Sequence, residues 1–252
     1  MLVAPPGTHG PRLLLAKSYQ PVKYLALETR PVRVSSCACD TVAVTMFEWE
    51  AGMFREFWRH GSNAALVFGV LIICACAALG FAPLSPLWVL AGVLVFYLSE
   101  YTFHRFLFHA PPSKRGWLLR LQRRLHYDHH VEPSRLDLLF LPLWFAVPNL
   151  AITGLIAWVL LGDWALAISL VLGATLALLQ YEWVHYAAHI PYRPHTRFGR
   201  WMKRYHLWHH FKNERFWFGV SNPVLDFVNG TYRQPEGVAR STTARVLHPD
   251  DQ

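Results

Sequence analysis

Four long apolar stretches constrain the fold most strongly, because each is long enough to cross a lipid bilayer. A hydrocarbon core about 30 Å thick needs roughly 20 helical residues at 1.5 Å per residue. Helices are favoured there because they satisfy their backbone hydrogen bonds within one segment. The sequence therefore predicts an all-α integral membrane protein with four transmembrane helices. The stretches are Ala64–Phe81, Pro86–Phe103, Leu138–Leu161 and Trp164–Val184.

Very short links join these stretches in pairs. Residues 82–85 connect the first two, and Gly162 and Asp163 connect the last two. Connections this short place consecutive helices side by side and antiparallel. We therefore expect two helical hairpins.

The basic residues indicate how the chain is oriented in the membrane. All 24 Lys and Arg residues lie before Ala64, between His104 and Arg135, or after His185, and neither hairpin tip has one. Segments rich in Lys and Arg stay on the cytoplasmic side. Four spans put these three segments on one face, so we predict that both termini are cytoplasmic. No nucleic-acid-binding motif accompanies the net charge of +8, which favours anionic lipid headgroups as its partner over nucleic acid.

Ten of the 14 histidines fall into four tight groups on this same predicted face. Helical residues three or four apart share a face, so the histidines within most groups can point at one metal. The five-residue step in the first group is about 140° off a common helical face, so the second span must end or distort there. The groups are H-x4-H (His104, His109), H-x2-HH (His126, His129, His130), H-x3-H (His185, His189) and H-x2-HH (His206, His209, His210).

The size of this histidine set predicts a dinuclear metal site in a cytosolic helical cap. One zinc ion needs only three or four protein ligands, whereas ten imidazoles can supply several ligands to each of two metals. Imidazole suits iron, zinc and copper, so the residue types leave the metal open. Because only neutral histidine binds metal, we expect metal affinity to fall below about pH 6.5.

The order and spacing of the four groups resemble those of the membrane-bound fatty acid hydroxylase superfamily, which includes sterol desaturases and fatty acid 2-hydroxylases. The resemblance covers roughly residues 95–232. One departure follows His130, where the 2-hydroxylases place Pro, then an acid, then Arg. This chain keeps Pro133 but has Arg135 and Leu138 at the other two places. The flanking residues that agree are Glu100, Tyr101, Tyr181, Phe218–Ser221, Asp226, Gly230 and Thr231.

The resemblance implies a di-iron enzyme that hydroxylates a membrane lipid. Its cofactors would be two iron ions, which zinc can replace in purified protein, with O2 as co-substrate. The substrate would be a fatty acyl chain, with C2 as one candidate position. Electrons would come from a separate donor of the cytochrome b5, ferredoxin or reductase type.

Two other functions stay open from the sequence. One is a carotenoid ring hydroxylase or sterol oxidase built on the same scaffold. The other, more remote, is a metal carrier without enzymatic activity. Transporters place their ligands near the middle of the membrane, whereas none of the ten histidines lies in the middle of a span. The histidine positions therefore disfavour a carrier.

Several carboxylates are candidates to orient the imidazoles through hydrogen bonds. Asp226 matches an acid of the family, and Glu182 precedes His185 by one helical turn, where the family commonly has Asp. Asp128 and Asp137 lie close to the second histidine group in the sequence. Glu100 lies near the end of the second span, where a charge is costly and usually functional.

The rest of the chain is divided as follows. Residues 1–46 are expected to be poorly ordered, residues 64–235 to form the hydroxylase-like domain, and residues 236–252 to form a flexible tail. Residues 47–63 are expected to form an amphipathic interfacial helix or an ordinary lead-in to the first span. Its candidate membrane-facing residues are Phe47, Met53, Phe54, Phe57 and Trp58, and the four histidines expected at the surface are His9, His60, His195 and His248.

Overall fold

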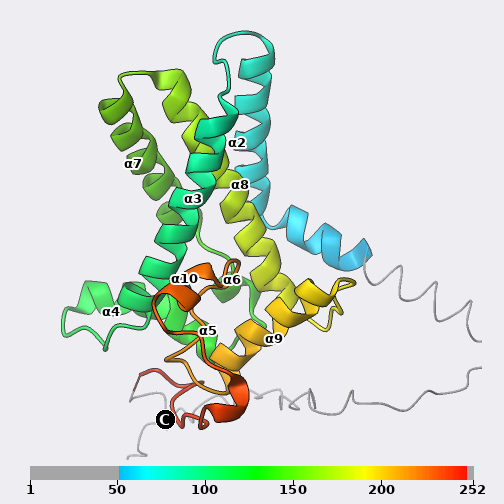
Figure 1. Ribbon diagram of the computed structural model, residues 1–252, viewed down its shortest axis with the longest axis vertical. Coiled ribbons are helices and arrows are strands. Elements are labelled where there is room, and N and C mark those ends of the chain that lie inside the picture. The colour runs from blue at the N-terminus through cyan, green and yellow to red at the C-terminus, as the bar shows by residue number, and fades with distance from the viewer. Residues whose placement is uncertain (1–50, 249–252) are drawn as a thin grey trace, which may run out of the picture. The chain divides into compact units, whose positions relative to one another are not determined.

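The computed structural model describes residues 51–248, so the predictions for residues 1–46, including His9, and for Phe47 lie outside the described residues. The described part is helical and contains no strand. Four of its helices are long and apolar enough to cross a membrane, which confirms the predicted integral membrane protein (Figure 1). They are α2 (Gly61–Ala78), α3 (Pro86–Phe103), α7 (Leu143–Leu161) and α8 (Trp164–His189).

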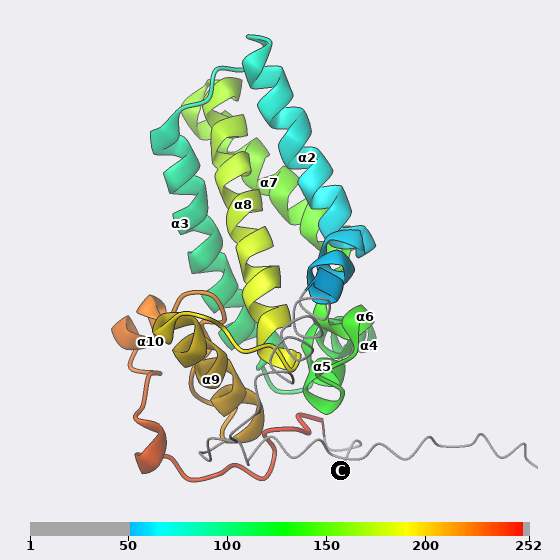
Figure 2. The same cartoon turned by 90° about the vertical axis from the view of Figure 1, so that its right-hand side faces the viewer.

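Shorter elements gather at one end of these four helices, where α3 and α8 end (Figures 1 and 2). The longest of them, α9, is 15 residues long. Two are π-helical turns, η1 and η2, in which each turn of helix is wider than in an α-helix. In chain order they are η1 (His104–Phe108), α4 (Gly116–Gln122), η2 (Arg123–Tyr127), α5 (Asp128–Val131), α6 (Leu136–Leu139), α9 (Arg197–Phe211), α10 (Val224–Val228) and the 3-10 turn η3 (Pro235–Gly237).

Helix α8 is the centre of the membrane part, because it packs against each of α2, α3 and α7. Its contact with α3 is especially close and depends on two glycines. A Cβ atom on Gly92 would lie 1.9 Å from the carbonyl oxygen of Leu170, and one on Gly173 would lie 1.8 Å from that of Val89. Small residues allow this close approach of two helices within a membrane.

The turn between α7 and α8 is made by the two residues that the sequence predicted. Gly162 ends α7 with a φ of 67°, a left-handed conformation that glycine adopts without strain. Asp163 then begins α8, and its carboxylate accepts from the backbone N–H groups of Ala165 and Leu166. Helices α2 and α3 are also joined by a short segment, but each packs mainly against α8.

The helix of the third span begins later than its apolar stretch predicted. The chain leaves the helical conformation between α6 and α7, at Phe140–Pro142. Pro142 has no backbone N–H and restricts the residue before it. The buried Glu182 side chain of α8 satisfies this break, since its Oε1 accepts from the N–H of Leu141 at 2.9 Å.

Residues 51–59 form a helix that contacts α8 and then breaks at His60. Met53 and Phe57 are buried in a cluster with Phe140 and Tyr186, so the prediction that these two residues face a membrane is wrong. Phe54 and Trp58 are 42% and 49% exposed. This helix is therefore a packed lead-in to α2 that also presents an aromatic face outward.

Candidate metal centre

All ten histidines of the four sequence groups converge below the ends of α3 and α8, and nine of their imidazole rings form two candidate metal sites. The ligand atoms of each site lie within 4.8 Å of one another. The tenth, His130, adjoins site B, because its Nε2 lies 2.9 Å from the Nε2 of His126. Site A contains His129, His185, His189, His206 and His210, and site B contains His104, His109, His126 and His209.

Each H-x2-HH group divides its histidines between the two sites. His126 belongs to site B and His129 to site A, and His209 belongs to site B while His206 and His210 belong to site A. Residues three apart on a helix differ by about 60° in direction, which is enough to aim at two neighbouring metals. The spacing predicted shared helical faces but did not show that one group serves two sites.

The structure confirms the distortion of the second span that we predicted at the first histidine group, His104 and His109. The backbone N–H of His109 donates to the carbonyl of His104 at 3.1 Å, which is the i+5 bond of a π-helix. This wider turn brings the two rings to the same side, and their centroids are 5.0 Å apart. A regular α-helix would have directed them about 140° apart.

The nitrogen atoms of site B have the arrangement expected around a metal. The Nε2 atom of His126 lies 2.7 Å from that of His109, 2.9 Å from that of His130 and 3.2 Å from that of His104. One imidazole nitrogen carries either one hydrogen or one lone pair, so it cannot make three hydrogen bonds. Metal–nitrogen bonds of about 2.0–2.1 Å at right angles place ligand nitrogens about 3 Å apart.

Site A shows the same convergence. Nε2 of His185 lies 2.9 Å from that of His129, and Nε2 of His189 lies 2.9 Å from that of His206. Both ring nitrogens of His210 are buried and have no hydrogen-bond partner among the described residues. Buried polar atoms are nearly always satisfied, so these orphaned nitrogens also fit a metal site.

Backbone carbonyls orient three of the rings. Nδ1 of His209 donates to the carbonyl of Phe216 at 2.8 Å, and Nδ1 of His104 donates to that of Phe218. Nδ1 of His130 donates to the carbonyl of Ala244 at 2.7 Å. A carbonyl only accepts, so each Nδ1 carries the hydrogen and leaves the Nε2 lone pair for a metal.

Trp217 lies between two of these carbonyls in a strained conformation. Its φ is 61°, which is rare for a residue other than glycine. The side chain is fully buried, and its indole N–H donates to the carbonyl of Arg233 at 2.9 Å. This turn lets the carbonyls on either side of Trp217, those of Phe216 and Phe218, reach two different histidines.

Asp226 supports the metal site through this turn rather than through a ring. Its fully buried carboxylate accepts from the N–H groups of Phe218 at 3.0 Å and Gly219 at 2.6 Å. It also accepts from the hydroxyls of Tyr205 and Thr231, both at 2.6 Å. The carboxylate therefore fixes the backbone of the turn at Phe218, whose carbonyl orients His104.

Glu100 fixes the same turn from the membrane side. Its Oε1 accepts from the N–H of Ser221 at 2.9 Å, and its Oε2 accepts from the Ser221 hydroxyl. These bonds explain how a buried carboxylate is tolerated near the end of a span.

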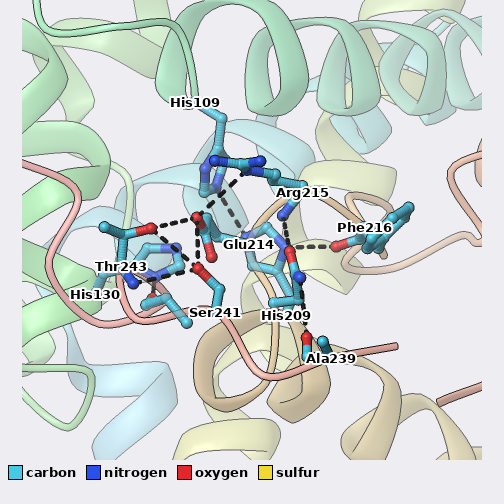
Figure 3. Close-up of polar contacts among 11 residues, drawn as sticks. His109, His130, His209, Glu214, Arg215, Phe216, Ala239, Ser241 and Thr243 are labelled. Carbon is cyan, nitrogen blue, oxygen red and sulfur yellow. Dashed lines mark hydrogen bonds and ion pairs between the residues drawn. The ribbon is translucent and has the colours of Figure 1, made fainter. Parts of the chain in front are cut away.

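The C-terminal segment contacts the centre, which differs from the flexible tail that we expected from residue 236. Glu214, which the sequence did not single out, accepts from Ser241 at 3.1 Å and Thr243 at 2.7 Å (Figure 3). This contact holds the segment that carries Ala244 beside His130. The second carboxylate oxygen of Glu214, Oε2, is buried without a partner among the described residues.

The other predicted carboxylates do not orient a ring. Glu182 satisfies the break before α7, as described above. Asp128 is 3.4 Å from Arg123, and Asp137 pairs with the exposed Arg135 at 2.6 Å. Both are pairs at the surface of the kind that contributes little to stability.

The remaining histidines differ in their surroundings. His195 is exposed, as predicted. His248 is 8% exposed and lies 3.1 Å from a guanidinium nitrogen of Arg123, so its predicted surface position is wrong. His60 is half-buried, with its ring centroid 4.5 Å from that of Phe140.

Lys203 connects α9 to the end of α8. Its ammonium group donates to the carbonyls of Ala187, Ile190 and Tyr192 at 2.6–2.9 Å. Burial lowers the pKa of Lys203 to about 8. The three bonds cap the α8 C-terminus and hold His206 of α9 opposite His189 of α8.

The buried histidines predict that the metal-free protein loses stability in acid. Burial lowers the pKa of His130 to about 3, and burial also lowers the pKa of His129 and His206. The unfolded histidines bind protons below about pH 6.5 and the folded ones do not, so each costs up to about 1.4 kcal/mol per pH unit. Thermal unfolding of metal-depleted protein should therefore shift to lower temperature as the pH falls from 6.5 to 5. An unchanged midpoint would contradict this burial.

An apolar cavity of about 410 Å³ meets site B on the membrane side. It lies between α3, α7 and α8, and His104 forms part of its wall. Two other lining residues, Leu98 and Ile152, are 57% and 55% exposed, so the cavity reaches the lipid-facing surface. Its aromatic lining consists of Phe96, Phe103, Phe108, Phe145 and Tyr181.

A second hollow of about 460 Å³ meets site B from another side. Its wall includes His109, which is half-buried whereas the other nine histidines are buried. Arg105, Glu214 and Arg215 also line it. Site B therefore borders the apolar cavity at His104 and the charged hollow at His109.

Comparison with known proteins agrees with this architecture. The family model described as fatty acid hydroxylase matches residues 89–231. Dihydroceramide fatty acyl 2-hydroxylase FAH2 of Arabidopsis thaliana is 35% identical over 163 residues, which are 64% of this chain and 67% of that protein. Fatty acid 2-hydroxylase of Rattus norvegicus is 33% identical over 54% of this chain, and the match spans only 37% of the rat protein.

A solved structure has the same fold. It is the hydroxylase domain of full-length scs7p, with a TM-score of 0.64 and 28% identity over 73% of this chain and 69% of that one. The family match covers more than half of the chain and includes all ten clustered histidines. The chain therefore belongs to the fatty acid hydroxylase family.

Proposed function

We propose that this protein is a di-iron oxygenase of the membrane that hydroxylates a fatty acyl chain, at C2 by analogy with its named relatives. One observation carries the proposal: His104 belongs both to site B and to the wall of an apolar cavity that reaches the lipid. A cavity of about 410 Å³ is in the range of small-molecule sites. A lipid chain in it would reach the metal centre without leaving an apolar environment.

The imidazole ligands are compatible with iron, and membership of the fatty acid hydroxylase family favours iron over zinc and copper. Sites A and B would hold one iron each, through imidazole groups alone or together with exchangeable ligands. When bound, the metals would supply the oxidising chemistry that a C–H bond requires and that side chains lack. Zinc has no redox chemistry, so zinc-loaded protein should be inactive.

The protein's own groups position the reactants. The apolar walls bind the chain and exclude water, and the carbonyls of Phe216, Phe218 and Ala244 hold two rings of site B and its neighbour His130. The reaction places one oxygen atom of O2 in the C–H bond and the other in water. It consumes two electrons and two protons, so an electron donor is required.

The basic residues support a cytoplasmic orientation of the metal centre. The segments that carry the histidines, residues 104–135 and 185–210, are the same segments that carry Lys and Arg between and after the spans. Retention of positive charge in the cytoplasm then puts the donor on that side.

We infer that the donor docks over the hollow beside His109. That ring is the most exposed of the ten, and the exposed Arg215 is at the edge of the hollow. In Arg215→Glu, the KM for soluble cytochrome b5 should rise several-fold with kcat unchanged, since opposite charges mainly speed encounter. The matched control is Arg197→Glu, which reverses an exposed charge at the start of α9, about 21 Å along the helix from its C-terminal end at Phe211. Equal effects of the two substitutions would contradict docking at this hollow.

Filling the cavity should shorten the chains that the enzyme accepts. Thr153 lines the cavity eight residues along α7 from Phe145, about 12 Å from the end beside site B. Thr153→Phe should therefore lower hydroxylation of long acyl chains more than that of short ones, measured by lipid mass spectrometry. Leu160→Phe, on a lipid-facing surface that is 77% exposed, is the control. An unchanged chain-length profile in Thr153→Phe would show that the substrate lies elsewhere.

The proposed function is tested by expressing the chain with an electron donor and analysing cellular lipids. A variant with alanine in all four histidine groups is the comparison. Hydroxylated acyl chains should appear only with the unaltered chain. Oxygenated carotenoids or sterols with unchanged acyl lipids would favour the alternative oxygenases, and metal accumulation without any oxidised lipid would favour a carrier.

A further inference from the structure

Helix α10 exposes three apolar residues beside the metal centre. Val224, Phe227 and Val228 are 56%, 53% and 74% exposed. In the same helix, Asp226 is fully buried and supports the turn at Phe218. The helix thus has one face fixed in the protein and an apolar face directed outward.

Both ends of this segment are attached to α3. Before α10, Ser221 bonds to Glu100 through its N–H and its hydroxyl. After α10, the hydroxyl of Thr231 lies 2.9 Å from that of Tyr101. Figures 1 and 2 both show α10 beside the last turns of α3. The position of α10 along α3 is therefore set by two consecutive residues of a spanning helix.

The attachment points lie inside the membrane-spanning part of α3. Twenty residues counted from Pro86 end at Arg105, and the hydropathy of the chain extends this span to Phe108. Glu100 and Tyr101 precede Arg105 by five and four residues, which corresponds to about 6–8 Å. Amphipathic helices that lie in the membrane interface bury their apolar face to a depth of about 5–10 Å.

The contacts of Arg105 support placing the membrane interface at this residue. Its guanidinium donates to the Tyr101 hydroxyl at 2.7 Å and lies 5.0 Å from the centre of the Phe106 ring. An arginine next to aromatic rings at the end of a span is typical of the headgroup level. The exposed face of α10 then lies just inside that level.

We propose that α10 is an interfacial membrane contact, with Val224, Phe227 and Val228 inserted at the boundary between lipid headgroups and acyl chains. Its partner is the lipid of the leaflet that borders the metal centre. Because α10 also carries Asp226, the membrane surface and the turn that orients His104 are linked by a single short segment. The proposal concerns where α10 lies and does not depend on the reaction.

A nitroxide spin label at residue 228 tests this placement. The variant Val228→Cys is made in a chain whose four cysteines are replaced by serine, and is reconstituted in phospholipid nanodiscs. Collision rates of the label are measured with O2, which concentrates in lipid, and with a water-soluble nickel chelate. The control is Arg240→Cys, an exposed position in the C-terminal segment.

The ratio of O2 to nickel collisions should be several-fold higher at position 228 than at position 240. Equal ratios at the two positions would show that α10 faces water and would overturn the proposal. Protection of position 228 from both reagents would show that protein covers it, which also overturns the proposal. Metal content equal to that of the unaltered chain confirms that both labelled variants are folded, and no activity is needed.

Discussion

Replacing His129 with alanine should remove the metal of site A while site B keeps its own, and replacing His126 should do the reverse. The two residues are three apart in one motif, yet their rings belong to different sites. We expect each variant to retain about one metal per chain and to lose at least about 100-fold in activity, since removal of groups that merely orient ligands costs 10–100-fold. Metal analysis and acyl hydroxylation assays measure both effects.

His195→Ala is the matched control for these variants. His195 is exposed and lies outside both sites, so metal content and activity should be unchanged. If His126→Ala and His129→Ala each lost both metals, the sites would be mutually dependent. If either kept both metals and full activity, the assignment of that histidine would be wrong.

Asp226→Ala should be the most damaging change among residues that are not candidate ligands. It removes the acceptor of four buried hydrogen bonds, two of them from the N–H groups of Phe218 and Gly219. Each donor left unsatisfied costs about 1–3 kcal/mol, so the two N–H groups alone should cost about 2–6 kcal/mol of stability. Release of the turn that orients His104 should also weaken metal binding by about 10–100-fold.

Asp226→Asn separates charge from shape. The amide retains the volume and one acceptor oxygen but directs an NH2 group at donors, so the loss should lie between that of Asp226→Ala and none. Thermal unfolding and metal titration in detergent provide the measurements. Asp137→Ala is the control, since that carboxylate pairs with Arg135 at the surface. Equal behaviour of the Asp226 and Asp137 variants would contradict the supporting role of Asp226.

The membrane architecture was predictable because it depends on composition over long windows. Four apolar stretches gave the number of spans. The break before α7 was not predicted, because the apolar run continues through it. Only Pro142 signalled the break, and the carboxylate that satisfies it, Glu182, lies 41 residues after the N–H that it accepts from.

The histidine set was also predictable, because ligand type and spacing are properties of the sequence. The distribution of the rings between the two sites was not, since a difference of about 60° between helical positions three residues apart decides it. The carbonyls that orient His104, His130 and His209 carry no sequence signal, because every residue has one. Glu214 acts through the C-terminal segment, and no local pattern links it to Thr243.

Metal stoichiometry tests the central claim most directly. Protein purified without oxygen, loaded with ferrous iron and freed of unbound metal should contain two irons per chain. The same preparation of the variant with alanine in all four histidine groups should contain none. A ratio of one iron per chain in the unaltered protein would contradict a centre built from two histidine sites.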